Sequence, residues 1–139
     1  MGLFNSADKS EIRVIQLYED DEDDAFLLKK ALDQTKDIKI QIVASGLKAL
    51  TALDKLPEAD IIFLDADMLH MDGIECLTRI RNINKNIPVI ILTTSYNESL
   101  IKQAQTLGAS GFISIPDSFK EYRSAIKAAL TTDWGKLNQ

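Results

Sequence analysis

Four side chains of types that bind cations and phosphoryl groups follow three apolar runs of this 139-residue chain. Glu19 and Asp20 come directly after the first run, Asp65 ends another, and Thr93 ends a third. Three carboxylates in one small space raise one another's pKa unless a cation neutralises them. Mg²⁺ suits such a site because it takes oxygen ligands in octahedral geometry and keeps several waters. A magnesium ion beside a carboxylate and a hydroxyl can stabilise a phosphoryl group.

The apolar pattern of the chain predicts how these side chains come together. Five short apolar runs alternate with amphipathic segments, which is typical of βα units that form a parallel sheet with helices on both faces. The predicted strands are residues 12–18, 38–44, 60–65, 88–93 and 111–115. The runs 61–64 and 89–92 are nearly continuous Ile, Val and Leu, which favours strands covered on both faces. We therefore predict an α/β fold in three layers, built on a doubly wound, five-stranded parallel sheet.

A segment with helical spacing follows each predicted strand. The expected inward-facing residues are Ala25, Leu28 and Leu32; Leu47, Leu50 and Leu53; Ile74, Leu77 and Ile80; Leu100, Ala104 and Leu107; and Phe119, Tyr122, Ile126 and Ala129. Asp72 and Ser118 each precede a glutamate by three residues, so both fit a capping box at the start of a helix. Gly108 is expected to end the fourth helix in the left-handed conformation.

The acidic residues 19–24 allow two interpretations. They could be helix caps and solvated loop charges, or part of a cation site. In a doubly wound sheet, ligands bind at the carboxyl ends of the strands. If the first and third predicted strands are neighbours, Glu19, Asp20 and Asp65 share one small space, which favours the cation site. Asp21 is then expected to cap the first helix, with the acids after it in the first turn.

The composition excludes several classes of protein. A net charge of −5 and a pI near 4.8 argue against a nucleic-acid surface, which needs clustered Lys and Arg. The apolar runs are too short to cross a membrane, and the N-terminus lacks the features of a signal peptide. A single Cys76 cannot form an internal disulfide, so we expect a cytoplasmic protein. We expect a lead-in over 1–10, one domain over 11–131 and a tail over 132–139.

Four segments resemble the receiver domain of bacterial two-component response regulators, over about residues 11–131. They are IQLYEDDEDDAFLLKKAL, IIFLDADMLHMDGIECLTRIR, IPVIILTTS and LGASGFISIP. The resemblance implies a CheY-like, flavodoxin-like (βα)₅ fold that takes a phosphoryl group from a phosphohistidine of a sensor histidine kinase or phosphotransfer protein. It implies a signalling protein rather than an enzyme. Its output would pass through a phosphorelay, a separate downstream protein or a homodimer. The acidic start and Trp134 also resemble stand-alone regulators that serve phytochrome-like kinases.

The resemblance implies a role for each matched site residue. Asp65 would be the nucleophile that becomes an acyl phosphate. Asp20 would ligate Mg²⁺ directly, Glu19 mainly through water, and Asp67 through its backbone carbonyl. Thr93 would donate its hydroxyl to a phosphoryl oxygen.

The resemblance also implies a switch. Phe112 matches the aromatic residue whose ring turns inward in the family once the threonine hydroxyl has moved inward. The face made by the fourth helix, the fifth strand and the fifth helix then changes shape, which is a population shift biased by new charge.

Two positions depart from the family pattern. Ile115 precedes Pro116 where the family has a lysine that contacts the phosphoryl group, a contact that contributes about 1.5–3 kcal/mol. Phosphorylation is therefore expected to be slow, short-lived or absent, and a receiver-like module that docks partners constitutively is the alternative. Leu69 and His70 replace the common Pro-Gly, and an exposed His70 would be mostly neutral at neutral pH.

A further alternative is an enzyme. Residues 61–67 and 89–93 resemble two motifs of haloacid-dehalogenase-type phosphatases, with Asp65 as nucleophile and Asp67 as general acid. In that family the nucleophile strand comes first, whereas here the acidic pair precedes it, so we favour the phosphorylatable receiver. Cys76 is expected to be a plain helix residue, because no nearby charge would lower its pKa. Trp134 is expected to pack back on the fifth helix, and a dimer or effector surface is the alternative.

Overall fold

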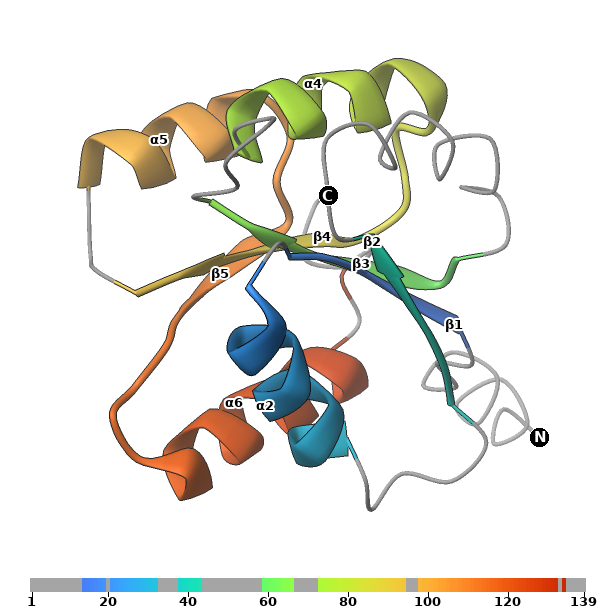
Figure 1. The fold of residues 1–139 in the computed structure, drawn as a ribbon. Helices are drawn as coiled ribbons and strands as arrows, with labels where there is room; N and C mark the ends of the chain where they lie inside the picture. Colours follow the sequence, from blue (N-terminus) through green and yellow to red (C-terminus); the bar gives the residue numbers. More distant parts are fainter. Residues whose placement is uncertain are drawn as a thin grey trace, which may run out of the picture.

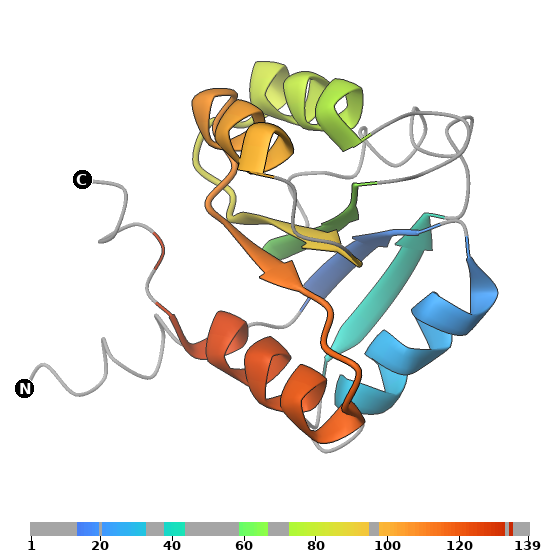
Figure 2. The ribbon, with the colours of Figure 1, turned by 90° about the vertical axis from the view of Figure 1, so that its left-hand side faces the viewer.

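The computed structural model describes residues 14–19, 21–32, 38–43, 59–66, 73–94, 98–132 and 134. These residues form nine helices and strands: β1 (Val14–Tyr18), α2 (Glu22–Leu32), β2 (Lys39–Val43), β3 (Ile61–Asp65), α4 (Gly73–Ile83), β4 (Val89–Thr93), α5 (Glu98–Thr106), β5 (Gly111–Ser114) and α6 (Phe119–Thr131). The sheet lies between two layers of helices (Figure 1), with α4 and α5 over one face and α2 and α6 over the other. The view from the side shows the same three layers (Figure 2).

The sheet is wholly parallel, and its strand order is β2-β1-β3-β4-β5. Each observed strand lies within a predicted range, and β1 is the neighbour of β3 as the site prediction required. The order reverses direction at β1, so the chain winds first toward one edge and then toward the other. The predicted three-layer, doubly wound α/β fold is confirmed.

The residues of the central strands alternate between two apolar cores. Ile62 and Leu64 of β3 join the core under α4 and α5, whereas Ile61 and Phe63 join the core under α2 and α6. All four side chains are fully buried. We call these clusters the α4/α5-side core and the α2/α6-side core. Because both faces of β3 are covered, its sequence is continuously apolar instead of alternating.

Polar side chains fix the starts of two helices. Asp21 Oδ1 accepts hydrogen bonds from the backbone amides of Asp23 at 2.8 Å and Asp24 at 3.1 Å, which confirms Asp21 as the cap of α2. Ser118 Oγ accepts from the amide of Glu121 at 3.4 Å at the start of α6. The predicted second helix and the predicted cap at Asp72 lie outside the described residues.

One of the remaining predictions about the helices is wrong. Gly108 has φ 104°, which confirms the left-handed conformation after α5. Cys76 is buried on α4 and forms no disulfide with any described residue, as expected of a plain helix residue. Phe119, however, is 37% exposed, so its expected place in the core is wrong. The core covers α6 only from Tyr122 onward, and the first residue of the helix lies beyond it.

The side chain of Trp134 packs against the α2/α6-side core, as expected. Its indole Nε1 donates to the backbone carbonyl of Ala129 at 3.0 Å. The ring lies so close to Gly111 that a Cβ there would stand 3.0 Å from it, so Trp134, which lies beyond the end of α6, contacts the start of β5. Among the described residues, no helix is long and apolar enough to cross a membrane.

Candidate functional site

The parallel register brings the ends of three strands together. Tyr18 of β1 pairs with Leu64 of β3, so the residues that follow them, Glu19 and Asp65, are also neighbours. The backbone amide of Glu19 donates to the carbonyl of Val43 at 3.0 Å, which holds the end of β1 against β2. Two carboxyl groups predicted to share a site therefore do lie side by side.

Glu19 is buried, with only 3% of its surface exposed, and its carboxyl group is hydrogen-bonded to that of Asp65. Burial, then the hydrogen bond and the charge of Asp65, raise the pKa of Glu19 to about 9, and the charge of Asp24 adds to this. The backbone amide of Asp21, 3.3 Å from Glu19 Oε2, acts in the opposite direction. Without a cation, burial and the neighbouring Asp65 thus favour the protonated form of Glu19.

Thr93 is the last residue of β4, and only 2% of its surface is exposed. Its backbone carbonyl accepts from the amide of Ile115 at 2.7 Å, and it pairs with Ser114 in the register of β4 and β5. The neighbouring carbonyl of Leu92 accepts from the amide of Ala66, directly after Asp65, at 2.9 Å. Thr93 is therefore held between the end of β3 and the end of β5.

The donor set fits a hard divalent cation. Glu19, Asp65 and Thr93 offer only oxygen atoms, which are the ligands that Mg²⁺ prefers. A cation would also replace the proton that the raised pKa of Glu19 retains. Asp20 and Asp67, the other expected ligands, lie outside the described residues, within which no group of three or more ligand-type side chains gathers.

The position of the missing lysine lies on the opposite side of β5 from Phe112. Ile115 packs against the α2/α6-side core, whereas Phe112 is 44% exposed and faces α5. The side chain of Ile115 thus contributes apolar packing and no positive charge. Leu69 and His70 lie outside the described residues.

Sequence reasoning missed one neighbour of the site. Tyr122 of α6 was expected only as a core residue, and it is buried there. Burial raises the pKa of its phenol, and the negative charges of Glu19 and Asp24 raise it further, so the ring lies near both acids. The helical spacing of Tyr122 predicted that its side chain faces the core. No feature of the sequence indicated that the phenol lies near the acidic residues.

Comparison with known proteins agrees with this geometry. Residues 15–127 match the response regulator receiver domain family. The chain is 38% identical over 87 residues to sporulation initiation phosphotransferase F of Bacillus subtilis, covering 63% of this chain and 69% of that protein. It is 30% identical over 118 residues to response regulator Rcp1 of Synechocystis, covering 78% of this chain and 80% of that protein.

Solved structures give the same result. The phosphorylated cyanobacterial phytochrome response regulator RcpA superposes with a TM-score of 0.76 at 27% identity, over 86% of this chain and 91% of that one. The Mn²⁺-bound form of Rcp1 superposes with a TM-score of 0.73 at 27% identity, over 84% and 90%. By contrast, the chain spans 32% of a similar protein-glutamate methylesterase of Trichodesmium erythraeum. The matched residues include all five strands apart from Val14, together with Glu19, Asp20, Asp65, Asp67 and Thr93, and the chain belongs to the family of response regulator receiver domains.

Proposed function

We propose that this chain is a cytoplasmic receiver that accepts a phosphoryl group on Asp65 from a phosphohistidine of a sensor histidine kinase or phosphotransfer protein. The observation that carries the proposal is the buried Glu19 hydrogen-bonded to Asp65, with the buried Thr93 at the end of the next strand. The acid pair lies at the carboxyl ends of the strands, which is where ligands bind in open α/β sheets, and this position favours a binding role over a purely structural one. The similarity to RcpA, a phytochrome response regulator, supports a phytochrome-like kinase as the donor.

In the proposed reaction, a carboxylate oxygen of Asp65 attacks phosphorus as the bond to the donor nitrogen breaks. The nitrogen keeps the bonding electron pair, and Asp65 becomes an acyl phosphate. Glu19, Asp20, Asp65 and the backbone carbonyl of Asp67 would hold Mg²⁺. When bound, the metal would supply the positive charge that keeps the carboxylates ionised and balances the phosphoryl oxygens. Burial of Glu19 and Thr93 excludes water from one side of the reacting group.

The output would begin at Thr93, whose hydroxyl would donate to a phosphoryl oxygen. Thr93 pairs with Ser114, so its movement would be transmitted to β5, where Phe112 lies two residues earlier. Phe112 is partly exposed beside α5 and would turn inward as the switch residue. The receiving partner would be a downstream protein or a second copy of the chain, docked on the face that contains Phe112.

Incubation with phosphoramidate and Mg²⁺, followed by intact-mass measurement, tests the proposal. The wild type should gain the mass of one phosphoryl group, and Asp65→Asn should gain none under the same conditions. Asp60→Asn is the matched control, because Asp60 is an exposed acid at the other end of β3 and should leave the mass gain unchanged. A gain that persists in Asp65→Asn would contradict Asp65 as the acceptor.

One observation favours a second function, the constitutive docking module. Ile115 is a packing residue of the α2/α6-side core, so position 115 supplies no cation to the phosphoryl group. If the wild type gains no mass while Ile115→Lys does, the docking function replaces phosphorylation as the conclusion. If both gain mass, we expect Ile115→Lys to react more than about tenfold faster, as an added charge-assisted contact implies.

A further inference from the structure

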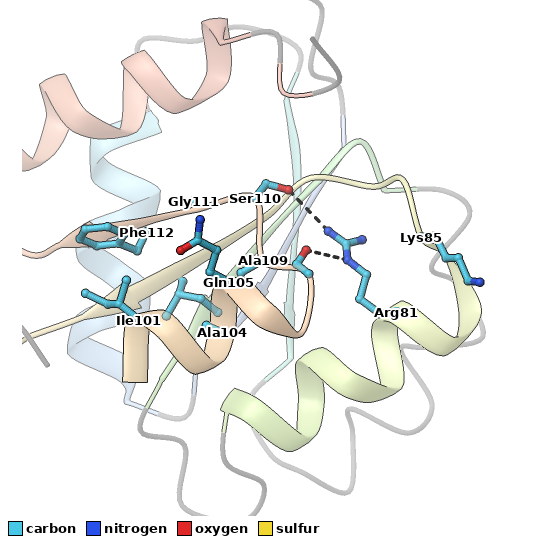
Figure 3. Close-up of a pocket in the computed structure, with 11 residues that line it drawn as sticks. Arg81, Lys85, Ile101, Ala104, Gln105, Ala109, Ser110, Gly111 and Phe112 are labelled. Atoms are coloured by element: carbon cyan, nitrogen blue, oxygen red, sulfur yellow. Dashed lines mark hydrogen bonds between the residues drawn. The ribbon is translucent and has the colours of Figure 1, made fainter. Parts of the chain in front are cut away.

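A pocket of about 570 Å³ lies between α4, α5 and β5, away from the acidic site. This volume is in the range of about 300–1,000 Å³ that is usual for small-ligand sites. Its apolar wall consists of Ile91, Ile101, Ala104, Ala109 and Phe112. Figure 3 shows Phe112 and Ile101 at one end, with Arg81 and Lys85 beyond the turn at residues 108–110 at the other. The pocket therefore has an aromatic, apolar end and a cationic end.

Arg81 is held in place before any ligand arrives. Its Nε donates to the carbonyl of Gly108 at 2.8 Å, and its Nη1 donates to the carbonyl of Asn84 at 3.1 Å. Its Nη2 donates to Ser110 Oγ at 3.5 Å. These bonds among the described residues use three of the five N–H groups of the guanidinium, which leaves two for another acceptor. A fixed guanidinium loses little conformational entropy when it binds an anion.

The charge of Arg81 is only partly balanced in the described structure. The residue is half-buried, and burial lowers the pKa of its guanidinium. Its three acceptors are two carbonyls and a hydroxyl, and no carboxylate of the described residues pairs with it. The described side chains that line the pocket include two cations and no acid. The pocket is thus complementary to a negatively charged molecule.

Charge and shape together define the class of ligand. Two cations match the two negative charges of a phosphate monoester, and a guanidinium can bind phosphate oxygens in a bidentate manner. At the other end, the exposed ring of Phe112 offers a face for stacking, and Ile101 offers apolar contact. A ligand that spans both ends must carry an aromatic group as well as a phosphate.

We propose that this pocket binds a small aromatic phosphate monoester of the nucleoside monophosphate kind. The phosphate lies against Arg81 and Lys85, and the aromatic ring lies against Phe112 and Ile101. Phosphorylation of Asp65 is not needed for this binding, so the site can be tested independently of the proposed function. A bound ligand would nevertheless contact Phe112, the proposed switch residue.

The test is a titration of the ¹⁵N-labelled chain with adenosine 5′-monophosphate, followed by NMR in the presence of a chelator. The chelator removes the metal, so the acidic site cannot hold the phosphate. We expect saturable shifts of the amide signals of residues 108–112, with a Kd below about 1 mM. Adenosine and inorganic phosphate, added separately, should each bind at least about tenfold more weakly, since each fills one end of the pocket.

Two variants separate the cationic end from general charge effects. Lys85→Glu changes an exposed side chain and should weaken binding about five- to tenfold. Lys127→Glu, on the exposed face of α6 in the opposite layer, is the matched control and should leave the Kd unchanged. Equal weakening by both variants, shifts confined to the Glu19 and Asp65 end, or no saturation at millimolar ligand would each overturn the proposal.

Discussion

Replacement of Glu19 by glutamine should stabilise the metal-free protein at neutral pH. Folding buries the Glu19 carboxyl group beside Asp65 and raises its pKa from 4.5 to about 9. In the unfolded chain the same group ionises freely at neutral pH. Ionisation therefore lowers the free energy of the unfolded state and not that of the folded state. Glutamine removes this difference and keeps an N–H group that can donate to Asp65.

The magnitude follows from the two pKa values. A pH of 7 lies about 2.5 units above the pKa of the Glu19 carboxyl group in the unfolded chain. At about 1.4 kcal/mol per unit, the buried carboxyl group destabilises the folded state by about 3 kcal/mol. Below about pH 4.5 both states are protonated and the destabilisation is absent; it grows as the pH rises and is complete above about pH 9. Glu19→Gln should therefore raise the free energy of unfolding by about 1–3 kcal/mol near pH 7, and by nearly nothing near pH 4.

Urea unfolding followed by circular dichroism, with a chelator present, measures this difference at about pH 4, 7 and 9. Glu22→Gln is the control, because Glu22 is an exposed acid in the first turn of α2. Added Mg²⁺ should stabilise the wild type by mass action and should stabilise Glu19→Gln less. The reasoning is refuted if wild type and Glu19→Gln lose stability in parallel from about pH 4 to 9, or if the variant is less stable near pH 7.

Three further predictions concern packing and backbone conformation, each measured by urea unfolding. Gly111→Ala should lower the free energy of unfolding by about 1 kcal/mol because its Cβ meets the Trp134 ring at 3.0 Å; in a Trp134→Ala background the same change should raise it by about 0.5 kcal/mol. An unchanged sign in the two backgrounds would contradict this contact. Gly108→Ala should lower it by about 1–3 kcal/mol, since φ is 104° and the Cβ would stand 3.0 Å from Arg81 Nε; a neutral result would argue against the left-handed turn. Asp21→Ala should lower it by about 1 kcal/mol, whereas Asp21→Asn should lower it much less because asparagine also caps helices.

Local patterns in the sequence were enough to predict the strands, the starts of α2 and α6 and the end of α5. The runs around Ile62 and Ile90 favoured strands covered on both faces, because buried parallel strands lose the alternation of a half-exposed strand. Asp21 and Gly108 could be assigned because a cap or a left-handed turn depends on the residue itself and on backbone groups within a few residues of it. The carboxylates were predicted to meet because the ends of parallel strands share one edge of the sheet.

What the sequence by itself determined is therefore the set of elements and the chemical character of the strand ends. Only the tertiary structure decided that Glu19 is buried against Asp65, that Phe119 lies outside the core, and that Ile115 packs against the core. The pocket likewise depends on Arg81 reaching Gly108, 27 residues away along the chain. The burial of a side chain, the shift of its pKa and the shape of a cavity arise from contacts between segments that are distant in the sequence. The packing of the helix layers on the sheet sets these contacts, and the pattern of neighbouring residues does not.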